Sequence, residues 1–475
     1  MTSPKRIDTL VVGGGPGGTP TAMALARAGR KVLLVEKGAG LGGTCLFEGC
    51  IPSKIFWESS RRLRELRALG TFGIRAGERG EPDLDWAVIM ERKHSILSRR
   101  AAAAMKAFEA IASLDYVHGS ATLIGPRRAK IFPEQGDSYE LDFSTAVLAT
   151  GSVPNPLPIP GIDSPRVLTS EGLLEIEAPP RSMVVIGGGP IGVEMAQIFR
   201  GFGTRITLLE AAPRILGPVD QDLALALERH MSEADGIEMH LSARVSAIRH
   251  EKDGVAVVFE NARNESSTAY GERVLEVTGR HPHVAGLGLE KTGVRFDRHG
   301  IKVNGRLETD EPGIYAVGDV VGNPMFAHWA TAQGLALARH LLGAEARFPT
   351  PAESTAVIFS TPEIAIAGLT ETAARQAGLD IGVATYHYAK DARAQVAGTA
   401  EGMLKLVFEA ESHRIVGAHA LVEGASGNAG EAAILVDAGL SLESVAAAIH
   451  PHPTLSESFG MLAREVLASL DGGRA

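Results

Sequence analysis

Cysteine is almost absent from this sequence: the 475 residues include only Cys45 and Cys50. A structural metal site would need two further ligands at short spacing. No second Cys or Cys/His cluster supplies them, so we expect no metal. Two buried structural thiols are another alternative. Two close thiols in a chain otherwise free of cysteine are more typical of a redox pair, and we favour a reactive disulfide.

Long apolar runs and an excess of basic residues are missing as well. No apolar run reaches the roughly 18 residues of a membrane span. The short polar stretch 1–8 leads directly into the apolar run Thr9–Val12 and leaves no room for a signal peptide, so we expect a cytoplasmic protein. The net charge of −9 argues against nucleic acid as a main partner.

The two cysteines lie in the segment GGTCLFEGCIPSK, residues 42–54. In an ideal helix, residues five apart have Cα atoms roughly 8.5 Å apart, beyond the reach of about 7 Å that a disulfide tolerates. A disulfide here therefore requires a distorted first helical turn. Gly49 and Pro52 make that distortion easier, because both are tolerated where a helix begins irregularly.

A glycine pattern occurs twice, as GGGPGG at residues 13–18 and as GGGPIG at residues 187–192. Each copy follows a short apolar run. A second apolar run then ends at an acidic residue, Glu36 in the first copy and Glu210 in the second. The acid lies 23 positions after the first glycine in both copies. Each copy therefore predicts a strand, a glycine turn, a helix and a second strand.

This spacing is typical of a dinucleotide site. The first glycine allows the tight turn, the second lets the backbone approach a pyrophosphate, and the third lets the helix pack on the strand. The acid accepts hydrogen bonds from ribose hydroxyls. Two glycine turns without a ligand are the alternative, but two copies with matched acids predict two dinucleotide sites.

The identity of the two nucleotides follows from the chemistry of the thiol pair. Nicotinamide passes two electrons as hydride, whereas cysteines exchange them through thiolate attack, so a flavin is the natural link. The cysteines follow the first glycine turn, so we expect FAD in the first half and NAD in the second. Glu210 would repel a 2′-phosphate, and no arginine follows it before Arg214, which favours NAD over NADP.

The order of these patterns predicts the domains. A hydrophobic content of 45% and a charged content of 22% indicate a globular chain long enough for several domains. The segments 147–152 and 277–280 each read as a closing strand and turn, and the proline-rich stretch 154–161 as a linker. We expect an FAD-binding domain at 1–152, an NAD-binding domain at 153–280, a second FAD or central part at 281–348 and a terminal domain at 349–475.

Three further segments, together with residues 42–54, carry a family resemblance over essentially the whole chain. Gly318-Asp319, Met325-Phe326-Ala327-His328 and the loop His450–Glu457 resemble the second FAD motif, the flavin-bordering segment and the acid/base loop of the class I pyridine nucleotide-disulfide oxidoreductases, most closely the lipoamide dehydrogenases. The resemblance implies an α/β fold with two Rossmann-like dinucleotide-binding domains, for FAD and NAD, and a C-terminal α+β dimerisation domain.

The resemblance also implies roles for the residues near the cysteines. Cys45 would be the interchange thiol that reacts with the dithiol substrate. Cys50 would lie against the flavin and form the charge-transfer thiolate. Lys54 would approach the flavin N5 region and pair with Glu194, which follows the second glycine turn.

In the same family, a histidine at the position of His452 is the catalytic base, is oriented by Glu457 and comes from the other subunit, which implies a homodimer. A neutral imidazole can take a thiol proton near pH 7, and a carboxylate behind it fixes its tautomer. An isolated His-Pro-His is more often a surface turn. We keep that interpretation for His450, with a supporting role at most.

The resemblance and the glycine motifs together predict the cofactor-binding residues. For FAD they are Gly13, Gly15, Gly18, Glu36, Lys37, Gly43, Thr44, Lys54, Gly119, Ala121, Thr150, Gly151, Ser152, Gly318, Asp319, Met325, Phe326, Ala327 and His328. For NAD they are Gly187, Gly189, Ile191, Gly192, Glu194, Glu210, Val245, Gly279 and Arg280.

Two departures from the lipoamide dehydrogenases bear on the substrate. Phe47-Glu48 replaces the usual Asn-Val between the cysteines. We expect a carboxylate there to raise the thiol pKa values and to repel an anionic substrate, unless it points into solvent. Trp329 replaces a common lysine and would put aromatic bulk near the flavin.

Three functions are compatible with these residues. The first is an NAD-dependent dihydrolipoamide dehydrogenase acting on a lipoylated carrier protein or a 2-oxoacid dehydrogenase complex. No lipoyl-carrier domain precedes residue 9, so the lipoyl group would arrive on another protein. The second is an NADH-driven reductase of a different disulfide. The third is a non-catalytic structural subunit, against which the intact Cys45, Cys50, Lys54, His452 and Glu457 argue.

Overall fold

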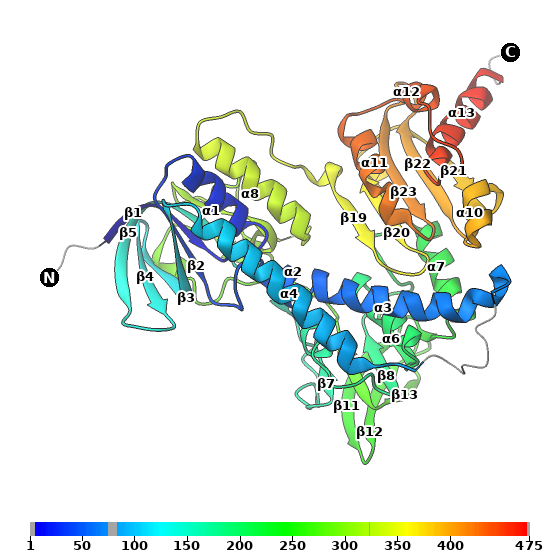
Figure 1. Cartoon of the computed structure of the whole chain (residues 1–475), viewed down its shortest axis with the longest axis horizontal. Helices are drawn as coiled ribbons and strands as arrows, with labels where there is room; N and C mark the ends of the chain where they lie inside the picture. The colour runs from blue at the N-terminus through cyan, green and yellow to red at the C-terminus, as the bar shows by residue number, and fades with distance from the viewer. Residues whose placement is uncertain (1–4, 75–82, 323, 473–475) are drawn as a thin grey trace.

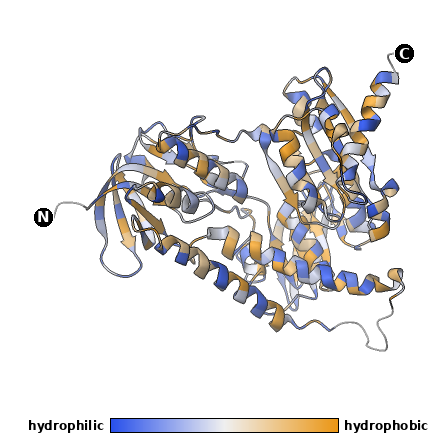
Figure 2. Cartoon of the chain, turned by 45° about the horizontal axis from the view of Figure 1, so that its top comes forward, coloured by the Kyte–Doolittle hydropathy of each residue, from blue (hydrophilic) through white to orange (hydrophobic). Residues whose placement is uncertain are grey.

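The computed structural model describes residues 5–74, 83–322 and 324–472. Its three lobes each contain a β-sheet, and the first and second glycine turns belong to different sheets (Figure 1). Apolar strands form the interior of each lobe, while polar residues lie on the outer faces of the helices (Figure 2). The predicted α/β fold class is confirmed.

The first lobe holds the first glycine turn. Strands β1, β2, β3, β5 and β18 of its sheet run parallel, and the antiparallel strand β4 pairs with β3 and β5. The bounds are β1 Lys5–Val12, β2 Val32–Glu36, β3 Leu114–Gly125, β4 Arg128–Pro133, β5 Tyr139–Leu148 and β18 Ile314–Ala316. Strand β18 returns to this sheet after the second lobe, so the first lobe is formed by two separate segments of the chain.

The second lobe holds the second glycine turn in an all-parallel sheet of order β10-β9-β8-β14-β7. Every residue of β8 is buried, which is typical of a parallel strand covered on both faces. An antiparallel sheet of β11, β12 and β13 accompanies it. The bounds are β7 Val167–Leu168, β8 Ser182–Ile186, β9 Arg205–Leu209, β10 Glu238–His240, β11 Arg244–Glu251, β12 Gly254–Glu260, β13 Ser266–Gly271 and β14 Arg273–Glu276.

The third lobe is C-terminal and contains an antiparallel sheet of order β19-β20-β23-β22-β21. Its strands are β19 Thr355–Ile358, β20 Ile364–Gly368, β21 Ile381–His387, β22 Met403–Glu409 and β23 Ile415–Leu421. Two-stranded pairs β6 Ser152–Pro154 with β15 Arg280–Pro282 and β16 Phe296–Asp297 with β17 Gly300–Ile301 complete the strands of the described chain.

The helices connect the lobes as well as covering their sheets. They are α1 Gly18–Arg27, α2 Gly43–Phe47, α3 Cys50–Ala68, α4 Trp86–Glu109, α5 Ser170–Leu173, α6 Pro190–Gly201, α7 Gln221–Glu233, α8 Ala327–Leu341, α9 Glu371–Gln376, α10 Ala392–Ala397, α11 Ala425–Asp437, α12 Leu442–Ala447 and α13 Glu457–Gly472. Helix α3 runs between the second and third lobes (Figure 1), and its Phe56 shares one apolar core with Phe199 of α6 and Ile358 of β19. This shared core fixes the cysteine-bearing helix against both lobes.

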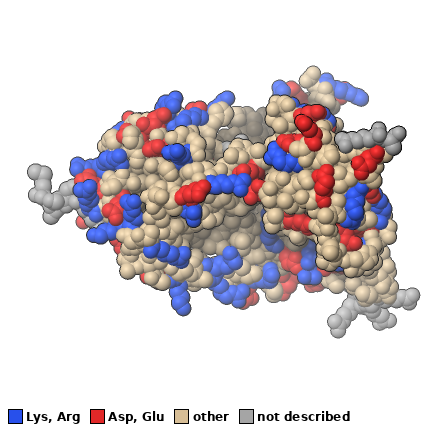
Figure 3. All heavy atoms as spheres, turned by 90° about the horizontal axis from the view of Figure 1, so that it is seen from above, with Lys and Arg blue, Asp and Glu red and all other residues tan. Residues whose placement is uncertain are grey.

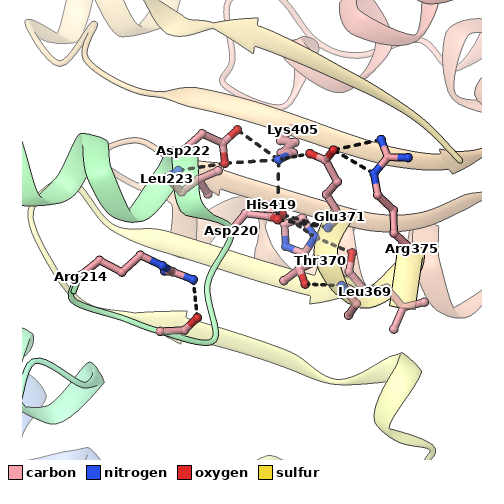
Figure 4. Close-up of polar contacts among 12 residues, drawn as sticks. Arg214, Asp220, Asp222, Leu223, Leu369, Thr370, Glu371, Arg375, Lys405 and His419 are labelled. Carbon is pink, nitrogen blue, oxygen red and sulfur yellow. Dashed lines mark hydrogen bonds and ion pairs between the residues drawn. The ribbon is translucent and has the colours of Figure 1, made fainter. Parts of the chain in front are cut away.

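An ionic cluster with a buried lysine also joins the second and third lobes (Figure 4). Lys405 of β22 is 6% exposed and lies 2.9 Å from Glu371 of α9, 3.2 Å from Asp222 of α7 and 3.6 Å from Asp220. Asp220 also accepts a hydrogen bond from the Glu371 N–H at 3.1 Å. His419 of β23 lies in the same cluster, where burial lowers its pKa.

Two expectations about local structure differ from the fold. The cysteines do not share one distorted helix: α2 ends at Phe47 and α3 begins at Cys50, with Gly49 between them at φ −146° and ψ −101°. The closing strands expected within 147–152 and 277–280 lie earlier in the chain. Strand β5 spans Tyr139–Leu148, and β14 spans Arg273–Glu276. The domain boundaries stay predictions.

Within the described ranges, no helix is both long and apolar enough to cross a membrane. Over the face seen in Figure 3, Lys and Arg are interspersed with Asp and Glu.

Candidate active site

One continuous cavity of about 2390 Å³ joins the two glycine turns. The cysteines lie along it, as do Lys54 and Glu194. Of the residues predicted to bind FAD or NAD, all line this cavity except Gly18 and Gly192. The space at each glycine turn is therefore continuous with the space beside Cys45 and Cys50.

The first glycine turn has the geometry of a dinucleotide cradle. Gly13 adopts φ +107°, a conformation that L side chains rarely take. A Cβ on Gly18 would lie 1.9 Å from the Gly13 carbonyl oxygen, whereas a Cβ on Gly15 would enter open space. The Glu36 carboxylate accepts hydrogen bonds from the Gly14 and Gly38 N–H groups at the same end of the cavity. This arrangement fits a bound dinucleotide, with Gly18 serving the helix–strand contact.

The second glycine turn repeats this geometry. Gly187 has φ +114°, and a Cβ on Gly192 would lie 1.9 Å from the Gly187 carbonyl oxygen. A Cβ on Gly189 would enter open space. Glu210 accepts hydrogen bonds from Gly188 and Ala212 N–H groups. The second turn therefore fits a dinucleotide as well, and Gly192, like Gly18, packs behind the site.

Arg214 does not lie free beside Glu210. Its guanidinium donates to the Leu216 and Gly217 carbonyl oxygens. The cation nearest in sequence to the second acid is therefore engaged with its own loop, which is consistent with the expected preference for NAD over NADP.

Polar residues at the boundary of the first two lobes form a chain that the sequence motifs showed only in part. Ser152 Oγ donates to Asp319 at 2.7 Å, and Arg280 donates to Ser152 Oγ and to its carbonyl oxygen, each at 2.9 Å. Burial raises the pKa of Asp319. Arg280 also pairs with Glu171 of α5 at 2.8 Å. Sequence reasoning missed Glu171, because no motif marks it.

The two cysteines are free thiols with opposite acidities. Their direct interaction is the largest influence on both: it raises the pKa of Cys45 and lowers the pKa of Cys50 to about 7. Burial raises both pKa values, and the Lys54 ammonium lowers both. When the pair loses one proton, the negative charge therefore falls on Cys50 and the remaining proton stays on Cys45.

The expected rise in the thiol pKa values caused by Glu48 stays a prediction, because the lowered pKa of Cys50 is the sum of several influences. Lys54 and Glu194 are the charged side chains that act on Cys50. Glu48 is exposed and lines the cavity beside the cysteines.

Lys54 and Glu194 form the ion pair that the resemblance implies. Lys54 Nζ lies 2.7 Å from Glu194 Oε2, with the side chains 29% and 9% exposed. Lys54 comes from α3, one helical turn after Cys50, and Glu194 comes from α6, directly behind the second glycine turn. The pair therefore connects the cysteine helix to the second nucleotide turn.

The segment from Met325 to His328 lines the cavity where α8 begins. The rings of Phe326 and His328 are stacked, 5.4 Å apart, and His328 Nε2 bonds to the Thr355 carbonyl oxygen at 2.7 Å. Trp329 differs from the expectation: it is buried in α8 and is not among the cavity-lining residues of the described chain.

His452 and Glu457 lie together but away from the cysteines of the same chain. His452 Nδ1 is 3.0 Å from Glu457 Oε1, and the His452 side chain is 72% exposed. The Thr454 N–H, together with His452, lowers the pKa of Glu457. In the described part of one chain neither residue lines the cavity, so this pair could act at the thiols only from a second subunit.

The surroundings of two other histidines, His450 and His283, differ from what the sequence indicated. His450 is not a free surface turn, because its Nε2 lies 2.9 Å from Glu431 Oε1 and its Nδ1 is buried. His283, to which the sequence assigned nothing, lines the cavity, and burial lowers the pKa of its imidazole. Its backbone carbonyl oxygen accepts a hydrogen bond from the Thr150 hydroxyl. No local pattern marked His283, because its contact comes from a distant segment.

Comparisons with known proteins agree with this geometry. Residues 7–334 match the family described as pyridine nucleotide-disulphide oxidoreductase, and residues 354–463 match its dimerisation domain. The chain is 34% identical to a dihydrolipoyl dehydrogenase of Thermus scotoductus, covering 98% of both chains. It is 35% identical to a dihydrolipoyl dehydrogenase of Geobacillus stearothermophilus, covering 97% of this chain and 96% of the relative.

A solved structure of the HOCl-induced flavoprotein disulfide reductase RclA from Escherichia coli is also similar. It shares 28% identity with a TM-score of 0.85, covering 97% of this chain and all of that one. The dimerisation domain supports a homodimer. The chain belongs to the pyridine nucleotide-disulphide oxidoreductase family, an enzyme family whose cofactors are FAD and NAD(H).

Proposed function

We propose that this protein is a dihydrolipoamide dehydrogenase, which oxidises protein-bound dihydrolipoyl groups and delivers their electrons to NAD⁺. The observation that carries the proposal is the continuous cavity that joins both glycine turns to Cys45 and Cys50. The curated relatives named dihydrolipoyl dehydrogenase support the choice of substrate. The lipoyl group would arrive on a carrier protein or within a 2-oxoacid dehydrogenase complex.

The thiol exchange follows from the acidities of the pair. In the oxidised enzyme Cys45 and Cys50 share a disulfide. His452 of the partner subunit takes a proton from one dihydrolipoyl thiol, and the resulting thiolate attacks Cys45 Sγ. The S–S bond breaks and Cys50 leaves as a thiolate, which its pKa of about 7 favours near neutral pH. The second substrate thiol then attacks the substrate sulfur of the mixed disulfide and releases the lipoyl disulfide. Its proton passes to the departing Cys45 thiolate, while the first proton stays on His452.

The surrounding residues hold this chemistry in place. Glu457 accepts the His452 N–H and stabilises the imidazolium while the proton is held. Lys54 stabilises the Cys50 thiolate, and Glu194 fixes the Lys54 side chain. We propose that Glu36 and Asp319 bind FAD and that Glu210 binds NAD. When bound, FAD links the two-electron chemistry of the dithiol to hydride transfer with NAD⁺.

The proposal is tested by anaerobic stopped-flow mixing of the oxidised holoenzyme with dihydrolipoamide and then with NAD⁺. We expect a long-wavelength absorbance from the Cys50 thiolate beside the flavin to appear with dihydrolipoamide and to disappear with NAD⁺. If NADH produces this absorbance and dihydrolipoamide does not, the thiol relay stands and the proposed substrate is wrong.

A second candidate is an NADH-driven reductase of another disulfide. The similarity to a protein described as a flavoprotein disulfide reductase supports it, and so does the exposed Glu48 carboxylate beside the cysteines. Under this alternative the same residues act in the reverse direction, with Cys45 attacking the disulfide substrate.

A further inference from the structure

A third residue contacts both members of the Lys54–Glu194 pair. Phe359 directly follows β19 in the C-terminal lobe, and Lys54 Nζ lies over its ring, 4.6 Å from the ring centroid. The Phe359 backbone N–H donates to Glu194 Oε1 at 2.8 Å, while Lys54 Nζ binds the other oxygen, Oε2, at 2.7 Å. One residue of the third lobe therefore touches the ammonium through its ring and the carboxylate through its backbone.

Helix α6 holds the backbone of this segment in a defined position. Gln197 lies on α6 almost one turn after Glu194 and is 2% exposed. Its amide accepts a hydrogen bond from the Thr361 N–H at 2.8 Å and donates to the Thr361 carbonyl oxygen at 2.7 Å. Glu194 and Gln197 together bind the backbone at 359 and 361, so the Phe359 ring is placed by the docking of the third lobe on α6.

A second aromatic ring limits the movement of Phe359. Trp57 lies on α3 almost one turn after Lys54, and its ring meets the Phe359 ring edge-on, with centroids 5.6 Å apart and an angle of 78°. The Phe359 ring under Lys54 therefore also packs against Trp57 of α3, the helix that begins at Cys50.

We propose that Phe359 is a positioning residue for the thiol pair: its ring holds the Lys54 ammonium close to Cys50 and so favours the Cys50 thiolate. This inference rests on the roles proposed above for Cys50 and Lys54. It assigns to the C-terminal lobe a direct part in the acidity of the redox centre, in addition to dimerisation.

The electrostatic reason is that two opposite charges compete at Cys50. Lys54 lowers the pKa of Cys50 and Glu194 raises it, so the balance depends on where the ammonium lies. A lysine side chain is flexible and strongly hydrated, and Lys54 is partly open to solvent. The Phe359 ring attracts the ammonium through its π face and closes one side of it. Without the ring, the ammonium moves toward water and acts less on Cys50.

The test uses the holoenzyme in a Cys45→Ser background, where Cys50 is the one cysteine left in the sequence. The readout is the pH titration of the Cys50 thiolate, followed by its ultraviolet and long-wavelength absorbance. We expect Phe359→Leu to raise the midpoint by about half a unit, so that at pH values below the midpoint about threefold less thiolate is present. Phe359→Met replaces the ring with similar volume and should give the same shift if the leucine variant does not fold.

Two variants separate positioning from general loss of structure. Phe359→Tyr keeps an aromatic face and should titrate like the parent. Phe408→Leu makes the same chemical change at a buried site of β22 in the same lobe and should leave the midpoint unchanged.

Lys54→Met tests whether Phe359 changes the titration midpoint of Cys50 through the Lys54 ammonium. It should raise the midpoint, and adding Phe359→Leu to it should cause no further rise, because both act through one ammonium. A parental midpoint in both Phe359→Leu and Phe359→Met, or an undiminished shift in the Lys54→Met background, overturns the inference. The titration needs neither dihydrolipoamide nor NAD⁺, so a wrong substrate in the proposed function leaves this test unaffected.

Discussion

Glu48 is the charged residue between the two cysteines, and its side chain is exposed in the cavity. Its carboxylate should repel dihydrolipoate, which is anionic, but not dihydrolipoamide, which is neutral. Two like charges about 4 Å apart in water repel by about 1 kcal/mol, or about fivefold in rate. We therefore expect Glu48→Gln to raise kcat/KM for dihydrolipoate about fivefold relative to dihydrolipoamide. Steady-state kinetics with both substrates measure this ratio.

The matched control is Glu411→Gln, which removes an exposed carboxylate in the turn after β22 and should leave the ratio unchanged. High salt should shrink the effect of Glu48→Gln, since exposed charges are screened. An unchanged ratio at low salt would show that Glu48 does not face the substrate.

Residues of the site that belong to a local pattern could be predicted, and those that depend on distant contacts could not. The spacing of glycines and acids indicated Glu36 and Glu210, and the cysteine motif indicated Lys54. The contacts of Glu171 with Arg280 and of Phe359 with Glu194 join residues 109 and 165 positions apart. No sequence pattern in a single chain encodes such pairs, because they arise from the packing of separate lobes.

At the scale of the elements, the ionic cluster between α7, α9 and β22 holds the second and third lobes together (Figure 4). Burial lowers the pKa of Lys405, but Glu371, Asp220 and Asp222 outweigh it, and the net pKa is raised. Lys405→Met leaves three carboxylates without their shared cation. We expect a loss of about 3 kcal/mol in the free energy of unfolding at pH 7, measured by urea denaturation.

The destabilisation caused by Lys405→Met should depend on pH. Lys405 lowers the pKa of Glu371 below 4.5, so this pair contributes stability above that pH and loses it as the pH falls through the lowered pKa. The penalty of Lys405→Met should therefore shrink in acid. Lys390→Met breaks an exposed pair with Glu465 and should cost less than about 1 kcal/mol. An equal loss in both variants would contradict a bridging role for the cluster.

The elements differ in how far the sequence specifies them. The strand–turn–helix units around both glycine turns were predictable, since apolar runs, glycines and acids follow one another within the chain. The order β19-β20-β23-β22-β21 and the return of β18 to the first sheet were not, because strand order depends on pairings between distant segments. The break between α2 and α3 was anticipated only as a distorted turn at Gly49.

We propose that electrons pass between the second nucleotide turn and the cysteine pair through one connected interior of the protein. The cavity that joins both turns to Cys45 and Cys50 supports this claim. The scarcity of cysteine makes it directly measurable, because any thiol that appears on reduction must be Cys45 or Cys50.

The most direct measurement is the number of thiols that NADH exposes in the anaerobic, oxidised holoenzyme. After addition of one equivalent of NADH, the protein is quenched with an alkylating agent and analysed by peptide mass. We expect no alkylation before NADH and alkylation of Cys45 and Cys50 after it. If the flavin is reduced by NADH and neither cysteine becomes alkylated, the cysteines are not in the electron path and the account is contradicted.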